Sequence, residues 1–333
     1  MSRHRVTPIR HRLAHVRPPR QQRGAALLLA MIIVTLVSTL AGAMVWQQWR
    51  AVQVEAAERS RAQSAWILNG ALDWARLILR EDARTGGSDH LGEPWAVPLA
   101  EARLSTFLAA DANDVVTEGG PEAFLSGLIV DAQARYNVGN LIAGDAVVPE
   151  ELAALQRLFD AIGVAPEYAL RIAEGLRGSA ASGAASAPVA RANAPLAPRR
   201  LDQLAWFGVD AESLRRMADH VVILPRATPV NLNTAGREVL AAVVPGLDLS
   251  GAERLLQARQ RTPFRTLAEA QALLTPGVVL TERRVGVASR YFEIRGRLRL
   301  DARVLEERTL VERRQLEIVP IATRRINSAE AFP

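Results

Sequence analysis

A long apolar stretch dominates the first part of the chain, because no charged side chain stands between Arg23 and Arg50. A helix rises about 1.5 Å per residue, so this stretch is long enough to cross the ~30 Å hydrocarbon layer of a membrane. A buried helix of a soluble core would need apolar neighbours on every side, and the adjacent sequence supplies none. The pattern predicts a transmembrane helix over residues 25–48.

The residues in front of this stretch are strongly basic. Residues 1–23 contain seven arginines and no acidic residue. By the positive-inside bias this end stays in the cytoplasm, and the rest of the chain is exported. Residues 40–43, which include Ala41, Gly42 and Ala43, resemble a signal-peptidase site, but the apolar run is too long for a signal peptide.

Beyond the apolar stretch the pattern becomes amphipathic. Apolar residues recur at helical spacing over residues 52–79. Gly86 and Gly87 then predict a stop, because glycine adopts the left-handed conformation at little cost. We expect one continuous helix to about Arg84, with its second half packed on a globular head.

Strand patterns occur in two distant parts of the chain. Residues 124–138 hold two short runs of β type with a polar break, and alternating runs at 290–300 and 309–318 predict a hairpin or meander. We expect these runs to join the strand near Tyr136 in one antiparallel sheet on the long helix. Residues 321–333 are predicted to be a disordered tail.

Between these strands the pattern turns helical and contains a repeat. Gly163 and Gly246 are each followed by alanine six residues later and by arginine eight residues later. This spacing is typical of a tight helix-turn-helix and predicts two small helical subdomains, over residues 146–178 and 201–284. The Ala-, Ser-, Gly- and Pro-rich residues 179–200 predict a flexible loop between them.

The overall charge is misleading. The formal charge of +6 and the pI of about 10.8 suggest nucleic acid or anionic lipid as a partner. Without the seven arginines of residues 1–23 the charge becomes −1, so no basic footprint for DNA remains.

Several kinds of chemistry are excluded by residue type. The chain has no lysine and no cysteine, which excludes a P-loop lysine, a Schiff base, a thiolate nucleophile and disulfide bonds. His90 and His220 are far apart in the sequence and are interpreted as surface or loop residues. A membrane-anchored enzyme that uses one of them stays an alternative, but no motif supports it.

A basic leader that ends in Gly24, followed at once by a long apolar helix, resembles the type IV prepilins. In that family a dedicated prepilin peptidase cuts after the glycine, and the new first residue, here Ala25, is N-methylated. The family usually has Glu at the fifth mature position, where this chain has Leu29. That departure is characteristic of the minor pseudopilin K of type II secretion systems (general secretion pathway protein K), which the chain resembles.

Two further segments carry this resemblance. Residues 131–137 have the form D-x-Q-x-R-aromatic-N, and residues 230–235 precede the second glycine repeat. The resemblance implies an α+β, pilin-like fold with a long N-terminal transmembrane helix packed on an antiparallel sheet. A helical domain of two small helix-hairpin-helix, SAM-like subdomains would be inserted in it. Residues 1–24 would be the leader, and residues 49–145 and 285–320 the α/β head.

The resemblance implies a function in assembly and not in catalysis. A minor pseudopilin K stands at the tip of the pseudopilus, where it helps initiate assembly and the export of folded proteins across the outer membrane. It is a single-pass protein of the bacterial inner membrane, with its C-terminal domain in the periplasm. Its implied partners are the I- and J-type minor pseudopilins, the pseudopilus and the prepilin peptidase. A minor pilin of a type IV pilus is the nearest alternative.

A helix-hairpin-helix DNA-binding or DNA-uptake protein is a further alternative, because residues 230–247 resemble such modules. There a second glycine approaches a DNA phosphate, and here Asp248 replaces it, which argues against nucleic acid as a partner. We therefore interpret Asn231 and Asn233 as residues that hydrogen-bond a turn, and Thr234 as the cap of the next helix.

No cofactor is predicted. Members of the pseudopilin K family bind calcium, but alanines and serines replace the acidic segment that they often have before the second helical subdomain. Residues 111–114 with Glu118 are acidic but lack the EF-hand glycine and closing glutamate, and we interpret them as a solvated turn.

Arginines alternate along one predicted strand, at positions 295, 297 and 299. Alternation places them on one face of the sheet. A solvated face is the simplest interpretation, and contact with a neighbouring pseudopilin is the functional alternative.

Overall fold

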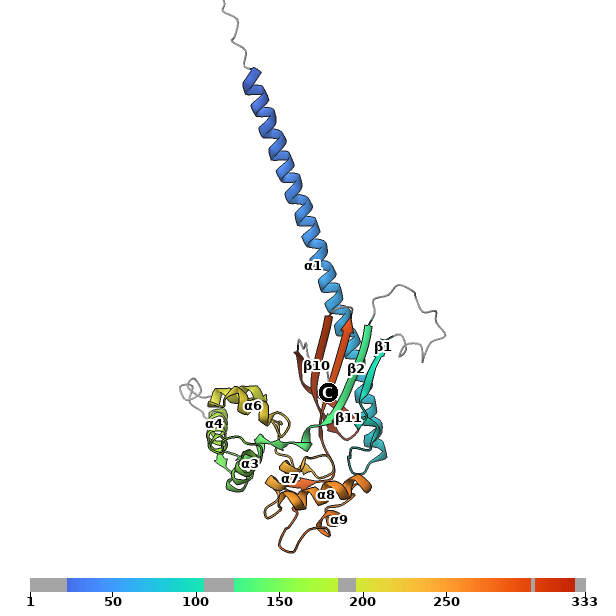
Figure 1. Ribbon diagram of the computed structural model, residues 1–333, viewed down its shortest axis with the longest axis vertical. Coiled ribbons are helices and arrows are strands. Elements are labelled where there is room, and N and C mark those ends of the chain that lie inside the picture. Colours follow the sequence, from blue (N-terminus) through green and yellow to red (C-terminus); the bar gives the residue numbers. More distant parts are fainter. Residues whose placement is uncertain (1–22, 105–122, 185–195, 301–302, 327–333) are drawn as a thin grey trace, which may run out of the picture. The chain divides into compact units, whose positions relative to one another are not determined.

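The long N-terminal helix is continuous and ends where the glycines predict. In the computed structural model, which describes residues 23–104, 123–184, 196–300 and 303–326, α1 runs over Arg23–Thr85 (Figure 1). Gly86 and Gly87 follow with φ angles of 66° and 122°, and the Gly86 amide donates to the Asp82 carbonyl over 3.2 Å. The chain forms two compact units, residues 1–63 and 64–333, and α1 contributes to both.

An antiparallel sheet forms the head together with residues 64–85 of α1, which confirms the predicted fold class. Its strand order is β1-β2-β9-β10-β11, so the last three strands form the predicted meander (Figure 1). The strands are β1 (Leu99–Arg103), β2 (Ala123–Asp131), β9 (Tyr291–Leu300), β10 (Arg303–Arg314) and β11 (Glu317–Ile326).

One face of the sheet receives the apolar stripe of α1. Alternate residues of β9, such as Ile294 and Leu298, are buried on this face in clusters that include Leu68 and Leu79 of α1. Trp95, from the short helix η1 (Pro94–Ala96), meets the ring of Phe292 edge-on, with 5.2 Å between the ring centroids. The second half of the long helix is therefore part of the core of the head.

The strand near Tyr136 does not join this sheet, so that prediction is wrong. After β2 the 3-10 turn η2 (Ala132–Ala134) redirects the chain, because the Asp131 carboxylate accepts from the Gln133 amide over 2.7 Å. The following strand β3 (Tyr136–Asn137) pairs in parallel with β6 (Val221–Val222) in a separate two-stranded sheet. The polar break thus marks the exit from the sheet.

The end of the chain also differs from the prediction. The run expected over 309–318 contains a turn at Gln315, which has a φ of 55°, between β10 and β11. Residues 321–326 were expected to be disordered, but they continue β11 because they pair with β10. Residues 327–333 lie outside the described residues.

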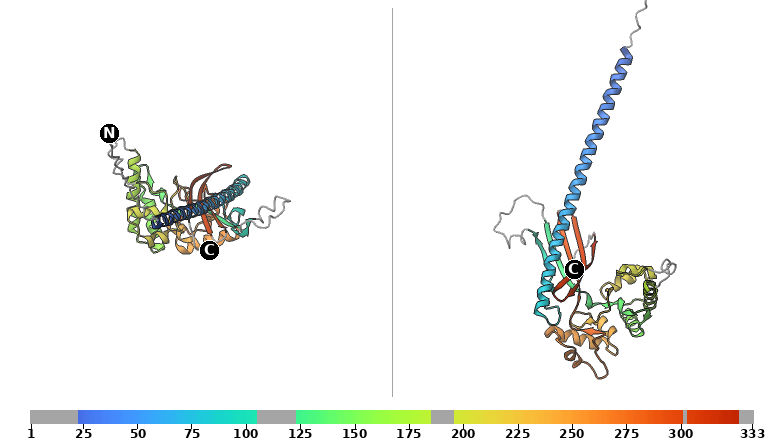
Figure 2. Two further views of the ribbon diagram at one scale, coloured as in Figure 1. Left: turned by 90° about the horizontal axis from the view of Figure 1, so that it is seen from above. Right: turned by 180° about the vertical axis from the view of Figure 1, so that it is seen from behind.

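Helices are the main regular elements of the insertion between β3 and β9 (Figure 2). They are α3 (Pro149–Ala161), α4 (Glu167–Ala184), η4 (Leu201–Phe207), α6 (Ala211–Met217), α7 (Arg237–Val243), α8 (Leu249–Arg261) and α9 (Leu267–Gln271). The smaller elements are η3 (Val138–Leu141), β4 (Ile142–Ala143), β5 (Ala146–Val147), β7 (Val230–Asn231) and β8 (Val285–Gly286), of which β7 and β8 pair in parallel.

Both predicted glycine hairpins are present. Gly163 has a φ of 68° between α3 and α4, and Gly246 has a φ of 79° between α7 and α8. Only glycine adopts this backbone region without strain, which explains why the residue recurs at the same place in each hairpin.

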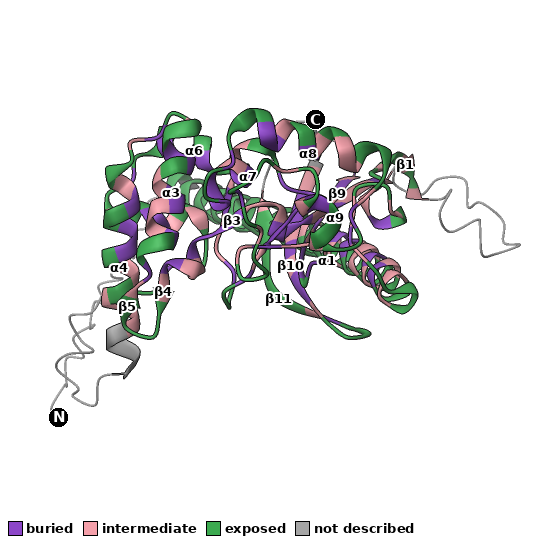
Figure 3. Ribbon diagram, turned by 90° about the horizontal axis from the view of Figure 1, so that it is seen from below, coloured by how far each residue is buried: buried purple, intermediate pink, exposed green. Residues whose placement is uncertain are grey.

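The helices of the insertion share one core, whose buried residues are purple in Figure 3. Because this core is continuous from Tyr136 to Val285, the boundaries expected for two subdomains stay a prediction. Within it η4 packs against α4 and α6, so residues 201–217 lie with the first hairpin. Residues 179–184 were expected in a flexible loop but belong to α4, and residues 185–195 lie outside the described residues.

Candidate functional site

The first half of α1 is an apolar surface without a protein partner in the structure. Every residue from Gly24 to Trp49 is exposed, and among the described residues α1 is the one helix long and apolar enough to cross a membrane. The Thr35 hydroxyl donates to the Met31 and Ile32 carbonyls over 3.0 and 2.9 Å, and the Thr39 hydroxyl donates in the same way to Leu36. These hydroxyl groups therefore need no water, as a helix in lipid requires.

The residues predicted for processing and assembly lie at the start of this surface. Gly24, Ala25 and Leu29 are all in the first turns of α1, and the Leu29 side chain is 60% exposed. No Asp or Glu occurs between Arg23 and Glu55, so the whole apolar segment lacks a negative charge. The roles of these three residues stay predictions.

A buried carboxylate lies where the insertion leaves the sheet. Asp131, at the end of β2, is 2% exposed. Its Oδ2 accepts from the hydroxyls of Thr234 and Ser289, each over 2.6 Å, and from Asn231 Nδ2 over 3.0 Å. Burial raises the pKa of Asp131, and these donors, together with the Gln133 amide, act against that rise. The carboxylate therefore links the end of β2 to two segments that are far from it in the sequence, residues 231–234 and Ser289.

Asn231 is the second centre of this junction. Its Nδ2 also lies 3.0 Å from the Asp89 carbonyl and 3.0 Å from Ser289 Oγ, while its Oδ1 accepts from the Asn233 amide over 2.9 Å. Asn233 in turn exchanges two hydrogen bonds of 2.9 Å with the backbone of Phe264. The turn predicted for Asn231 is confirmed, whereas the Asn233 side chain joins this turn to the distant backbone of Phe264.

The prediction for Thr234 is wrong. α7 begins at Arg237 with Gly236 in the cap position, and the Thr234 hydroxyl donates to Asp131 instead. The local sequence pattern suggested a cap, but a distant buried carboxylate is the stronger acceptor. As a result, the two motifs at 131–137 and 230–235 meet in one hydrogen-bond network.

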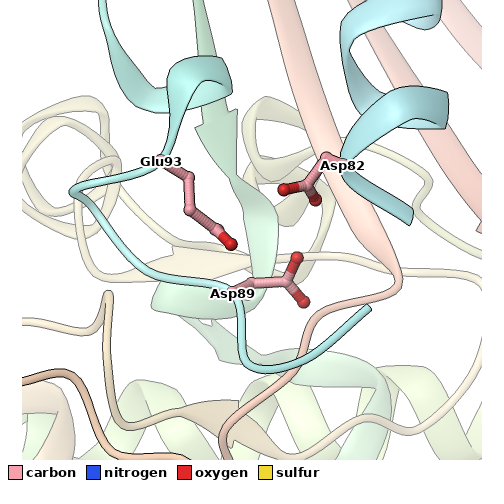
Figure 4. A group of neighbouring side chains, drawn as sticks. All are labelled: Asp82, Asp89 and Glu93. Carbon is pink, nitrogen blue, oxygen red and sulfur yellow. The ribbon is translucent and has the colours of Figure 1, made fainter. Parts of the chain in front are cut away.

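Three acidic side chains gather next to this junction, at the end of α1 and in the loop after it (Figure 4). Asp82, Asp89 and Glu93 have oxygens within 4.8 Å of one another. Arg313 of β10 donates to Asp82 over 2.8 Å and to the two oxygens of Asp89 over 2.6 and 2.5 Å. Glu93 Oε2 accepts from the His90 amide and from Trp95 Nε1 over 2.9 and 2.7 Å.

These contacts do not fit a calcium site. The Arg313 guanidinium already supplies a positive charge, and four of the six carboxylate oxygens already accept hydrogen bonds. Ca²⁺ needs six to eight oxygen ligands, so few oxygens are left for it. The segment between Glu174 and Asp202, where the family resemblance would place calcium ligands, contains no carboxylate. The acidic residues at 111–114 and Glu118 lie outside the described residues.

The contacts of Arg313 with Asp82 and Asp89 were not predicted from the sequence. Arg313 follows Thr309 and Val311 at alternate positions of β10, and both of these are buried. Arg313 therefore occupies a position that the alternation of buried residues predicts to face the core. A charged side chain at such a position indicates a buried partner, because an unpaired buried charge is costly.

The second hairpin carries an anion where a DNA phosphate would approach. Asp248 caps α8, since its Oδ1 accepts from the Gly251 amide over 2.7 Å. This hydrogen bond and that from Ser250 hold the pKa of Asp248 below its ordinary value. The carboxylate therefore stays charged, which is unfavourable for a phosphate at this turn.

The two histidines lie in loops, as predicted. His90 follows α1, where its Nδ1 accepts from the Gly92 amide over 3.1 Å, and His220 follows α6, with its Nδ1 3.2 Å from the Arg216 carbonyl. Through these hydrogen bonds each histidine ring contacts only a residue nearby in the sequence.

Two family models match the insertion, and both are described as Type II secretion system (T2SS), protein K. One matches residues 134–226, which include α3, α4 and α6, and the other matches residues 230–283, which include α7, α8 and α9.

Known proteins of that description are similar over most of the chain. Type II secretion system protein K of Klebsiella pneumoniae is 31% identical over 273 residues, which cover 74% of this chain and 78% of the relative. The protein of the same name from Pseudomonas aeruginosa is 28% identical over 319 residues, or 89% of this chain and 87% of the relative.

A solved structure has the same fold. It is the crystal structure of the GspK-GspI-GspJ complex from the enterotoxigenic Escherichia coli type 2 secretion system. The match has a TM-score of 0.57 and 18% identity, and it covers 82% of this chain and 99% of the other.

The substitution Asn231→Ala tests the buried junction. It leaves Asp131 and the Asp89 carbonyl with fewer donors, so we expect the free energy of unfolding to fall by about 1–3 kcal/mol. Denaturant titration of the full chain in detergent measures this change. The control is Asn69→Ala, at an exposed position of α1, which should leave stability almost unchanged. Equal effects of the two substitutions would contradict the role of the junction.

Asp82 should make stability depend on pH. Burial, with Glu93 and Asp89 nearby, raises the pKa of Asp82 from 3.8 to about 6 despite Arg313. The folded protein therefore holds this proton more tightly than the unfolded chain, and stability falls as the pH rises from about 4 to about 6. Asp82→Asn should reduce this fall in thermal unfolding curves. Asp73→Asn, at an exposed position of the same helix, should not, and identical pH profiles for Asp82→Asn and the parent chain would refute the assignment.

Proposed function

Because the chain belongs to the family of type II secretion system protein K, we propose that it is the minor pseudopilin at the tip of the secretion pseudopilus. There it would help initiate pseudopilus assembly and the export of folded proteins across the outer membrane. Its role is assembly and not catalysis.

The observation that carries this proposal is the charge-free segment from Gly24 to Trp49, with Leu29 at the fifth position after the glycine. Cleavage after Gly24 would leave the positive amine of Ala25 at one end of an apolar helix. A charge at that depth is costly unless it is paired. A Glu at the fifth position of another subunit can pair with this amine. Leu29, in contrast, provides no carboxylate for the amine of another subunit.

This asymmetry favours a terminal position. The subunit can accept a carboxylate from a subunit below, but it cannot neutralise the amine of a subunit above. It therefore suits the tip of a fibre and not the shaft. The likeness to a chain of the GspK-GspI-GspJ complex supports the I- and J-type minor pseudopilins as its neighbours.

The membrane orientation follows from the same segment. The seven arginines before Gly24 favour a cytoplasmic leader, so the head and insertion would lie in the periplasm and α1 would cross the inner membrane. The prepilin peptidase would remove residues 1–24 and methylate Ala25.

Processing can be tested by intact mass and N-terminal sequencing of the chain from membranes with and without prepilin peptidase. We expect an N-methylated chain that starts at Ala25 only when the peptidase is present. Gly24→Val should keep the leader, because a side chain before the scissile bond hinders the peptidase. Gly42→Ala, in the same apolar segment, should be processed normally. Cleavage near Ala43, or a retained leader with active peptidase, would refute the proposal.

The tip position can be tested with Leu29→Glu. The new carboxylate can pair with the amine of another subunit, so we expect more copies of the chain in each sheared pseudopilus. Quantitative mass spectrometry against the I-type pseudopilin measures the ratio. The control Leu28→Glu adds the same charge at the neighbouring position. An unchanged ratio, or the same rise with Leu28→Glu, would contradict the proposed role of Leu29.

A further inference from the structure

A cleft of about 600 Å³ lies between the sheet and the insertion. One wall is the sheet face opposite to α1, formed by β9, β10 and β11, and the other wall includes η4, α6 and β6. Seven of the side chains that line it are arginines, and three are acidic. The cleft is therefore a concentrated positive site on a chain whose net charge after residue 23 is only −1.

Three of these arginines stand directly opposite one another. Arg308 of β10 pairs in register with Arg295 of β9 on one side and with Arg324 of β11 on the other. Like charges at opposed positions destabilise a sheet. A row of three across neighbouring strands thus brings no stability to the sheet itself.

The acidic residues nearby compensate only part of this row. Arg295 Nε donates to Glu293 over 2.5 Å, and Arg308 Nε donates to Glu306 over 2.6 Å. Glu293 also accepts from Arg135 over 3.2 Å, so one carboxylate serves two guanidinium groups. Among the described residues Arg324 has no acidic partner.

The facing wall also holds unused donors. Arg199 and Arg215 are exposed, and neither side chain has an acidic partner in the described part of the chain. On the sheet side, Arg324 is exposed as well. Positive groups on both walls are therefore available to a ligand.

The other lining residues indicate what kind of anion fits. Leu214, Val221, Ile223 and Leu310 add aliphatic surface between the arginines. None of the described lining residues is aromatic, so the cleft lacks the stacking platforms that single-stranded nucleic acid requires. A small inorganic anion would leave the aliphatic surface unused. A segment in which carboxylates alternate with aliphatic side chains would contact both the arginines and the aliphatic surface. Arginine suits such a segment because it binds a carboxylate through two parallel hydrogen bonds.

We propose that this cleft binds an acidic, extended segment of a partner protein. The segment would lie between the arginine row of the sheet and Arg215 of α6. This binding site goes beyond the proposed place at the tip, and it holds whether or not the chain occupies that place.

The test uses the full chain in detergent and a fluorescent peptide of alternating Asp and Val residues. Fluorescence anisotropy should show binding that weakens as salt rises, and the matching Asn-Val peptide should not bind. Arg324→Gln and Arg215→Gln, one from each wall, should each raise the Kd roughly ten-fold, the effect expected for a lost charge-assisted hydrogen bond. Neither substitution breaks an ion pair among the described residues, so both variants should fold.

The control is Arg283→Gln, which removes the same charge from an exposed position outside the cleft and should leave the Kd unchanged. An equal loss of affinity with Arg283→Gln would mean non-specific charge attraction and would overturn the proposal. So would equal binding of the Asn-Val peptide, or no binding of the acidic peptide. Displacement of the acidic peptide by inorganic phosphate at equal concentration would assign the cleft to small anions instead.

Discussion

The buried carboxylate of Asp131 is the point on which the arrangement of the head and the insertion depends. A buried charge is costly unless donors replace the water that it loses. The donors here come from β7, from the turn after it and from Ser289, two residues before β9, so they are present only when these segments meet. Since Asp131 lies opposite Phe292 in the sheet, the insertion leaves and returns at neighbouring strand ends. The hydrogen bonds of Asp131 thus join the two ends of the insertion.

Ser289 extends this constraint to the long helix. Its hydroxyl donates to Asp131, its amide donates to Asp89 over 2.5 Å, and its carbonyl accepts from Arg313 over 2.7 Å. Arg313 also holds Asp82 in the last turns of α1. The C-terminal part of α1, the sheet and the insertion are therefore joined through one residue. As a result, the insertion is held to the same core as residues 64–85 of α1.

The sequence predicts those features whose cause is local. The length and end of α1 follow from the apolar run and from Gly86, and the two hairpins follow from Gly163 and Gly246. The features that it failed to predict depend on partners far along the chain. The pair of β3 and β6 is two residues long and joins Tyr136 to Val221, so it leaves no periodic signal. In the same way, no residue near Thr234 in the sequence indicates that its acceptor is Asp131. The cleft could not be predicted either, because three strands and helices from another part of the chain form it together.

Two departures from local rules remain after the fold is explained, and both concern charge. Leu29 leaves an apolar helix without the carboxylate that type IV prepilins usually have, and the row of Arg295, Arg308 and Arg324 carries more positive charge than the neighbouring glutamates neutralise. Neither feature stabilises the chain by itself. A folded protein tends to break such rules at functional sites, where another molecule completes the interaction. We infer that the first departure limits which subunits can assemble with the helix, whereas the second selects an acidic partner for the head.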